Sequence, residues 1–256
     1  TQEFADAHPS LIIVGLVGSI DNDMVGTDMT IGADTALHRI LDAIDQLTST
    51  AASHQRTFVV EVMGRHCGYL PLMAAVAGGA DYVFTPEDPA GQGWQDDLAE
   101  HLRLGREAGR RESIVLVAEG AHDRDGNELS TQLIADTIQE RTGEDARVTI
   151  LGHVQRGGTP SAYDRWMSTL LGYAAVQEIL DSSAEDEPVI LGVRRNRITR
   201  VPLMKAVHDT RAVKDLIAAG DYAAAQASRG SSFSSMVGIY HLLSTPPQLI
   251  PEPTGD

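Results

Sequence analysis

The stretch LIIVGLVGSIDNDMVGTD, residues 11–28, decides the fold class. Its first seven residues are apolar or glycine, which predicts a strand buried on both faces of a parallel sheet. Gly18 ends this run, and Asp21 and Asp23 follow at the carboxyl end of the strand, where open α/β sheets bind ligands. One such carboxylate can hold a hard cation such as Mg²⁺, and the other can accept a proton from a hydroxyl. Taken alone, however, the stretch fits a polar turn better, because Asp and Asn are common turn residues.

The composition is that of an ordinary globular protein, with 42% hydrophobic and 22% charged residues among 256. The formal net charge of −16 argues against a surface for nucleic acid or an anionic membrane, so an anionic substrate needs a local cluster of arginines. Cys67 is the only cysteine, which excludes an intrachain disulfide and indicates a reducing, cytoplasmic setting. No apolar run reaches membrane-spanning length.

Further along the chain, short apolar runs alternate with segments of helical periodicity, which predicts the α/β class with largely parallel sheets. Strands are predicted at 57–62, 113–120 and 188–193. Residues 81–87 are predicted as a strand with its loop, and 146–158 as a strand running into a basic, Gly-terminated loop. The helices are predicted at 31–54, with Thr30 as N-cap, and at 69–77, 93–108, 130–141, 161–180 and most of 203–244. Residues 194–203 look like an exposed turn, and the Pro-rich, acidic residues 245–256 look like a linker or tail.

Polar side chains follow four of these strands, where a ligand site of an α/β sheet is expected. They are Asp21 and Asp23, then Met63, Gly64 and Arg65, then Glu119, then His153, Gln155 and Arg156. Each alone is more simply a solvated cap, but four sets in succession favour a site. Arginine binds phosphate bidentately, so several converging arginines predict a phosphorylated substrate, although each alone is more simply a surface ion pair. The candidates are Arg56, Arg65, Arg147 and Arg156.

Long motifs then carry a resemblance to a known family. They are GSIDND, GTDMTIG, SHQRTFVVEVMGRHCG, VAEGA, RVTILGHVQRGGTPSAYDR and VPLMKAV. Together they resemble the 6-phosphofructokinases, and among these the resemblance is strongest to the amino-terminal, catalytic half of the large eukaryotic enzymes. AYDRW and STLLG resemble the fungal members. The resemblance implies a two-domain, three-layer α/β/α fold with mainly parallel sheets. Its parts would be the end of the larger domain at 1–32, the smaller sugar-phosphate domain at 33–154, the return to the larger domain at 155–202, and C-terminal helices at 203–244.

The resemblance also implies a role for each candidate. Asp21 would take the proton from the 1-hydroxyl of fructose 6-phosphate, Arg65 would stabilise the transferring phosphoryl group, and Asp23 would help hold Mg²⁺. Ser19 would contact the phosphoryl group or the sugar. The sugar pocket would be formed by Met63, Gly64 and Glu119, and the 6-phosphate would bind His153 and Arg156. Arg56 and Arg147 would reach the site of a neighbouring subunit, so the active sites of a homo- or hetero-oligomer would be shared.

Gly18 favours ATP as phosphoryl donor, because pyrophosphate-dependent relatives usually carry Lys there, while Gly leaves room for a nucleotide. Two alternatives stay open: a pyrophosphate-dependent relative, and a non-catalytic regulatory or structural subunit that binds sugar phosphates, although such halves typically lose the carboxylate at Asp21. The family's glycine-rich nucleotide loop and its regulatory carboxyl-terminal half have no counterpart in the chain. We therefore expect a fragment of an allosteric glycolytic enzyme that lacks most of the ATP site, incomplete in its larger domain and inactive in isolation.

Overall fold

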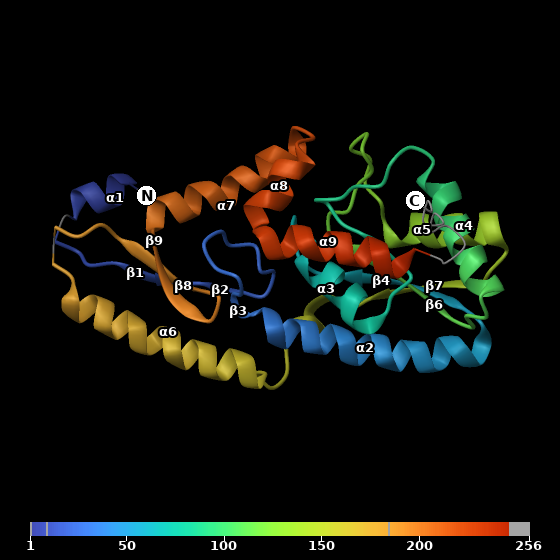
Figure 1. Cartoon of the computed structure of the whole chain (residues 1–256), viewed down its shortest axis with the longest axis horizontal. Coiled ribbons are helices and arrows are strands. Elements are labelled where there is room, and N and C mark those ends of the chain that lie inside the picture. Colours follow the sequence, from blue (N-terminus) through green and yellow to red (C-terminus); the bar gives the residue numbers. More distant parts are fainter. Residues whose placement is uncertain (1, 9, 184, 246–256) are drawn as a thin grey trace, which may run out of the picture.

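The computed structural model describes residues 2–8, 10–183 and 185–245, and it places two α/β lobes along the long axis of the molecule (Figure 1). Apart from Thr245, the linker predicted for 245–256 lies outside these residues. No helix in the described ranges has the length and apolar character needed to cross a membrane.

The first lobe, here called the four-stranded lobe, has a parallel sheet in the order β5-β6-β4-β7. The strands are β4 (Thr57–Val62), β5 (Tyr82–Phe84), β6 (Ser113–Ala118) and β7 (Ala146–Ile150). Alternate residues face opposite sides: Val60 packs with α2 (Ala33–His54) and α3 (Tyr69–Gly78), whereas Val59 packs with α4 (Trp94–Glu107) and α5 (Thr131–Thr142). β6 is buried along its whole length, because it has a strand on each side and helices on both faces.

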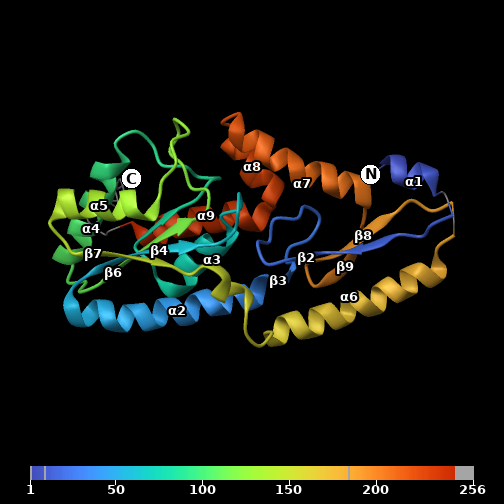
Figure 2. The same ribbon diagram turned by 180° about the vertical axis from the view of Figure 1, so that it is seen from behind.

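The second lobe, here called the three-stranded lobe, has the strand order β1-β8-β9. β1 (Val14–Leu16) pairs in parallel with β8 (Val189–Arg194), and β9 (Arg197–Pro202) returns antiparallel to β8. α6 (Ala162–Asp181) and α7 (Leu203–Ala218) lie on opposite sides of this sheet (Figures 1 and 2). A short helix, α1 (Gln2–Ala7), precedes β1. The α/β class with mainly parallel sheets between helix layers is thus confirmed.

Five further elements lie between the lobes or return the chain across them. β2 (Gly18–Ser19) and β3 (Ile31–Gly32) form a short parallel pair, and the 3₁₀ helix η1 (Gly152–Arg156) follows β7. α8 (Tyr222–Arg229) and α9 (Ser231–Ser244) bring the chain back, and α9 packs on the four-stranded lobe through Phe233, Val237 and Tyr240. α2 and α6 run along one side of the molecule, and their N-termini meet between the lobes (Figure 2).

Three local predictions are wrong. The strand predicted at 11–17 is shorter and is not buried on both faces, because Leu11 is 50% exposed and Leu16 39%. Among the described residues, β1 lies at the edge of its sheet. The turn predicted at 194–203 is mostly β9, joined to β8 by Arg195 and Asn196. Both residues have positive φ, as a type I′ hairpin turn requires. The N-cap of α2 is Gly32, because the Thr30 hydroxyl donates to the Ser19 carbonyl instead.

Candidate active site

The loops after β2, β4 and β6 meet one another and the 3₁₀ helix η1. The Arg65 Nε lies 3.8 Å from the Asp21 Oδ2, which joins the loop after β2 to the loop after β4. The Glu119 Oε2, after β6, accepts from the main-chain amides of Gly64 and Arg65 at 3.3 and 3.1 Å. The Gln155 Oε1, on η1, accepts from the Met63 amide at 3.3 Å. The strand ends that were expected to form a site therefore do come together.

Asp21 is the most unusual group in this cluster. The residue is only 6% exposed, and its Oδ1 is buried without a hydrogen-bond partner among the described residues. Burial raises the pKa of the Asp21 carboxyl and nearby Asp23 raises it further, while the charges of Arg65 and Arg156 oppose that shift. A carboxylate with one unused oxygen and an elevated proton affinity is well suited to accept a proton from a bound hydroxyl.

The sequence SIDND gives the two aspartates different surroundings. Asn22 adopts a left-handed conformation with φ 52°, which Asn tolerates better than most residues, and its Oδ1 accepts from the Thr30 amide at 2.7 Å. The Asp23 Oδ1 accepts from the Ser19 hydroxyl at 2.8 Å, and the same hydroxyl accepts from the Asp21 amide at 3.2 Å. The carboxylate of Asp23 is thus hydrogen-bonded to the Ser19 hydroxyl, whereas the carboxylate of Asp21 lies near the Arg65 guanidinium.

Two glycines permit close backbone contacts here, one within the loop after β4 and one between that loop and the loop after β6. A Cβ at Gly64 would lie 2.4 Å from the Cys67 carbonyl oxygen, and its φ of +157° also disfavours other residues. A Cβ at Gly120 would lie 2.6 Å from the Arg65 carbonyl oxygen. Arg65 itself is held at φ 53°, with its guanidinium exposed to solvent. The loop therefore places the exposed guanidinium of Arg65 next to the buried carboxylate of Asp21.

The other predicted residues are distributed unevenly. Arg156 is near enough to lower the pKa of Asp21, and it lines a cavity of about 290 Å³ with Gln155. His153 lies exposed on the same 3₁₀ helix. Gly18 lies in β2, and a Cβ there would meet no atom of the described residues within 4 Å. This space is compatible with the room that was expected beside Gly18.

Arg56 and Arg147 do not join the cluster. Both contact the Asp145 Oδ2, at 2.7 Å from the Arg56 Nε and 3.0 Å from the Arg147 Nη2. They lie where β4 and β7 begin, whereas Met63 and Arg65 follow the end of β4. Six strand residues at about 3.3 Å each separate the two sheet edges by roughly 20 Å. Within one chain these two arginines are too far away to touch a ligand at Asp21.

A divalent cation would find few protein ligands here. Across the residues that the structure describes, no group of three or more His, Cys, Asp or Glu side chains could hold a metal ion. Asp21 and Asp23 of the loop after β2, together with the Ser19 hydroxyl at the end of β2, offer oxygen ligands. Such a sparse set fits Mg²⁺, which proteins often hold through one or two carboxylates together with substrate phosphates.

Sequence reasoning missed a buried ion pair beneath the site. The Arg229 Nε donates to the Glu87 Oε1 at 2.9 Å, and the side chains are 7% and 0% exposed. Glu87 follows β5 just as Glu119 follows β6, so its position was a usable signal. Arg229, at the end of α8, carries no local signal, because its partners lie far away in the sequence.

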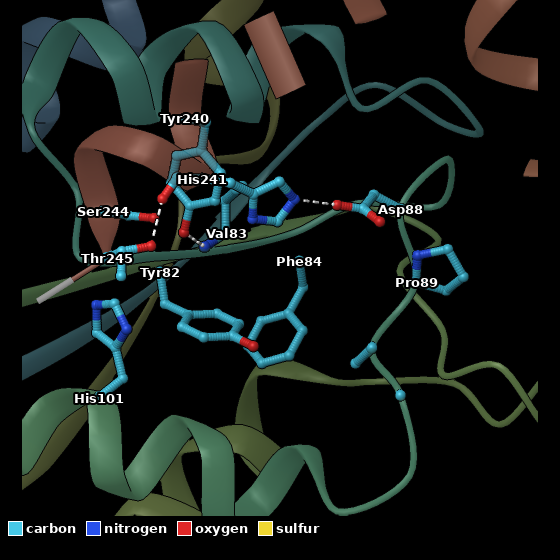
Figure 3. Close-up of a pocket in the computed structure, with 12 residues that line it drawn as sticks. Tyr82, Val83, Phe84, Asp88, Pro89, His101, Tyr240, His241, Ser244 and Thr245 are labelled. Carbon is cyan, nitrogen blue, oxygen red and sulfur yellow. Dashed lines mark hydrogen bonds and ion pairs between the residues drawn. The ribbon is translucent and has the colours of Figure 1, made fainter. Parts of the chain in front are cut away.

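A separate cavity of about 240 Å³ borders β5 and the end of α9 (Figure 3). There the His241 Nε2 contacts the Asp88 Oδ2 at 2.7 Å, and this hydrogen bond raises the pKa of His241. The Tyr240 hydroxyl accepts from the Val83 amide at 2.8 Å. These contacts attach α9 to β5 and to the loop that carries Glu87, and none of the predicted site residues takes part.

Comparison with known proteins gives a consistent result. The family model described as Phosphofructokinase matches residues 1–179. The chain is 49% identical over 240 residues to the liver-type ATP-dependent 6-phosphofructokinase of Bos taurus, covering 94% of this chain and 31% of that protein. It is 50% identical over 256 residues to the ATP-dependent 6-phosphofructokinase of Aspergillus niger, covering 98% of this chain and 33% of that protein. The chain thus spans about a third of the length of the curated relatives it matches.

Solved structures agree with these relatives. The phosphofructokinase of Saccharomyces cerevisiae superimposes with a TM-score of 0.90 at 44% identity, covering 95% of this chain and 32% of that one. The pyrophosphate-dependent phosphofructokinase of Marinobacter aquaeolei has a TM-score of 0.67 over 80% of this chain and 55% of that one, but at 21% identity it supports the fold alone. The sequence match, the family model and the shared fold together show that the chain belongs to the phosphofructokinase family.

Proposed function

We propose that this chain supplies the catalytic and sugar-phosphate-binding side chains of an ATP-dependent 6-phosphofructokinase. The reaction transfers the γ-phosphoryl group of ATP to the 1-hydroxyl of fructose 6-phosphate, giving fructose 1,6-bisphosphate in the cytoplasm. The observation that carries this proposal is Asp21, a buried carboxylate with one partnerless oxygen beside the exposed guanidinium of Arg65. A merely regulatory sugar-phosphate subunit has no need of such a group.

In the proposed reaction, Asp21 accepts the proton of the 1-hydroxyl while the oxygen forms its bond to the γ-phosphorus. The bond between the γ-phosphorus and the bridging oxygen of ADP breaks, and ADP leaves with that electron pair. The raised pKa of Asp21 makes it a stronger base than an ordinary aspartate. Arg65 stabilises the negative charge on the equatorial oxygens, since phosphoryl transfer depends mainly on positioning and electrostatics.

Asp23 is the residue proposed to hold Mg²⁺, with Ser19 orienting its carboxylate. The Ser19 hydroxyl occupies the Asp23 Oδ1 and leaves the other oxygen free of hydrogen bonds to the described residues. When bound, Mg²⁺ neutralises charge on the transferring phosphates. Gly18, which has open space at its Cβ position, lies where the nucleotide would approach.

The sugar phosphate is proposed to lie between the loop after β4, Glu119 and η1. The Glu119 Oε2 is engaged by two main-chain amides, so its Oε1 is available to a sugar hydroxyl. Met63 and Gly64 would border the sugar ring. Arg156, with His153 on the same short helix, would bind the 6-phosphate through charge-assisted hydrogen bonds.

Arg56 and Arg147 are proposed to bind the 6-phosphate held by a neighbouring subunit. Their distance of roughly 20 Å from the site of their own chain supports this assignment. The site would therefore be complete only in an oligomer. Domain limits are proposed accordingly, with 33–154 as the sugar-phosphate domain and 1–32 with 155–202 as parts of the other.

The test combines binding and turnover. Fructose 6-phosphate should bind the chain in isothermal titration calorimetry, and Arg156→Ala should weaken binding at least tenfold. Arg200→Ala is the control, because Arg200 pairs with Glu178 in the other lobe. Failure of the chain to bind the sugar phosphate, or equal affinity for unphosphorylated fructose, would contradict the proposed substrate.

Turnover should be assayed in a preparation that phosphorylates fructose 6-phosphate, with ATP and pyrophosphate as alternative donors. Asp21→Asn keeps the shape of the side chain but removes the base, so kcat should fall by three or more orders of magnitude with little change in sugar-phosphate affinity. Activity with pyrophosphate but not with ATP would show that pyrophosphate is the phosphoryl donor. Full activity of Asp21→Asn would rule out Asp21 as the catalytic base.

A further inference from the structure

The buried ion pair of Arg229 and Glu87 touches both loops of the proposed active site. The Arg229 Nη1 donates to the Asp23 carbonyl oxygen at 3.0 Å, and its Nη2 donates to the His66 carbonyl oxygen at 2.8 Å. The Glu87 Oε2 accepts from the Gly68 amide at 2.8 Å. The pair therefore bonds to the main chain within two residues of Asp21 and of Arg65.

Local packing leaves little freedom for this arrangement. A Cβ at Gly68 would lie 2.6 Å from the Thr85 Cβ and 2.8 Å from the Glu87 Oε2, so only glycine allows this approach. The Gln226 side-chain amide, on α8, donates to the Glu87 carbonyl at 2.9 Å. α8 thus fixes the backbone of Glu87, while Arg229 of the same helix fixes its carboxylate.

The loops that this pair contacts also contain strained backbone. Asn22 and Arg65 both adopt left-handed conformations, with φ of 52° and 53°. Such residues keep their conformation only where the surrounding structure specifies it strongly, and they often occur at functional sites. Each lies within one residue of a main-chain carbonyl held by Arg229.

We propose that Arg229, through Glu87, is a positioning residue that fixes the Asp23 loop against the Arg65 loop in the geometry needed for phosphoryl transfer. This inference rests on the proposed function. The guanidinium of Arg229 donates from three separate nitrogens held in one rigid plane. A lysine ammonium also has three donors, but they all sit on one nitrogen, so lysine can reproduce only part of this arrangement. Replacing a buried ion pair by apolar side chains often leaves stability unchanged, so stability alone does not explain the pairing of Arg229 with Glu87. What apolar side chains could not supply are the hydrogen bonds that this pair makes to the two loops.

The experiment uses three variants of the chain. Arg229→Met removes every donor but keeps much of the length, Arg229→Lys keeps the charge, and Arg200→Met is the control at an exposed arginine of the other lobe. Hydrogen exchange is followed by mass spectrometry in peptides that cover 20–24, 63–69 and, as internal reference, 165–176 of α6. Affinity for fructose 6-phosphate is measured on the same samples.

In Arg229→Met, exchange in both loop peptides should accelerate at least tenfold while the reference peptide stays unchanged, and fructose 6-phosphate should bind at least tenfold more weakly. Arg229→Lys should recover part of both effects, and Arg200→Met should show neither. Unchanged exchange in the loops, or an equal rise in all three peptides, would overturn the positioning role.

Two further arms keep the result decisive. If Arg229→Met does not fold, Glu87→Gln replaces it. Gln keeps one acceptor oxygen for the Gly68 amide, but it loses the charge and turns an NH2 donor towards the Arg229 Nε. It should accelerate exchange in the 63–69 peptide by a smaller factor. If the unaltered chain does not bind fructose 6-phosphate, the proposed function fails, while the exchange measurements still decide whether Arg229 orders the two loops.

Discussion

Replacing Asp164 should lower the free energy of unfolding strongly, because its carboxylate joins the two lobes. It lies in the first turn of α6 and is 4% exposed. Its Oδ1 accepts from the Gly32 amide at 2.8 Å and its Oδ2 from the Thr35 amide at 2.9 Å, and the Thr35 hydroxyl donates to the same oxygen. The carboxylate of one helix thus caps the N-terminus of the other, α2.

The magnitude for Asp164→Ala follows from these contacts. Each amide that loses a charged, mostly buried acceptor costs about 1.5 kcal/mol, and a carboxylate at a helix N-terminus contributes about 1 kcal/mol through the helix dipole. The free energy of unfolding should therefore fall by about 4 kcal/mol. Asp164→Asn should cost about half as much, because an amide can replace only one of the two acceptor oxygens.

Urea unfolding provides the assay, and the two tryptophans report on different lobes. Trp94 lies in α4 of the four-stranded lobe, and Trp166 lies in α6 of the three-stranded lobe. Variants with one tryptophan replaced by Phe let each lobe be followed separately. Asp181→Ala, at the exposed C-terminal end of α6, is the control and should change stability by less than about 0.5 kcal/mol. A loss below about 1 kcal/mol for Asp164→Ala would refute the reasoning.

Three further predictions concern the active-site loop, the end of α9 and the sheet edge. Gly64→Ala should cost about 3 kcal/mol, because its Cβ would meet the Cys67 carbonyl and its φ is positive; thermal unfolding checks this against Gly172→Ala in α6, where the Cβ has open space. The contact with Asp88 raises the pKa of His241 above 6.5. The contribution of this pair to the free energy of unfolding is therefore complete below pH 6.5 and is lost as the pH rises through the raised pKa. Unfolding of His241→Gln and the unaltered chain should therefore converge at high pH, and a constant difference would contradict the assignment. Arg56→Ala should leave fructose 6-phosphate affinity unchanged in the monomer and weaken it only in oligomers, as titrations at concentrations fixed by ultracentrifugation can show.

Much of the fold could be predicted from hydrophobic periodicity. The buried runs at 57–62 and 113–118 became β4 and β6, because central parallel strands need apolar residues on both faces. The helix at 161–180 became α6 with Ser161 as its side-chain N-cap. Periodicity could not tell an edge strand from a central one, so the exposure of Leu16 was missed. β9 was missed because four arginines within 194–200 suggested a solvated turn.

The site could be predicted only in part. The local sequence pattern indicates where a strand ends, but it does not indicate which residues from distant segments contact that end. Asp21, Arg65 and Glu119 each follow a buried strand, and the structure brings them together. That Asp21 would be buried with an unused oxygen depends on packing, which no local pattern records. Arg229 depends on a contact with Glu87 from a distant part of the chain. The roles of all these residues stay predictions until the variants are measured.

The pairing of β1 with β8 has a consequence for the order of folding. The four-stranded sheet is built from one continuous stretch, β4 to β7, and can form as soon as that stretch is available. β1 precedes this stretch and β8 follows it, so β1 must wait for its partner through the synthesis of everything between them. Contacts between distant residues form slowly, and an unpaired apolar strand is exposed to aggregation during the wait. On the ribosome, the four-stranded sheet should therefore form first, and the run at Leu11–Val17 should be the segment that most needs a chaperone.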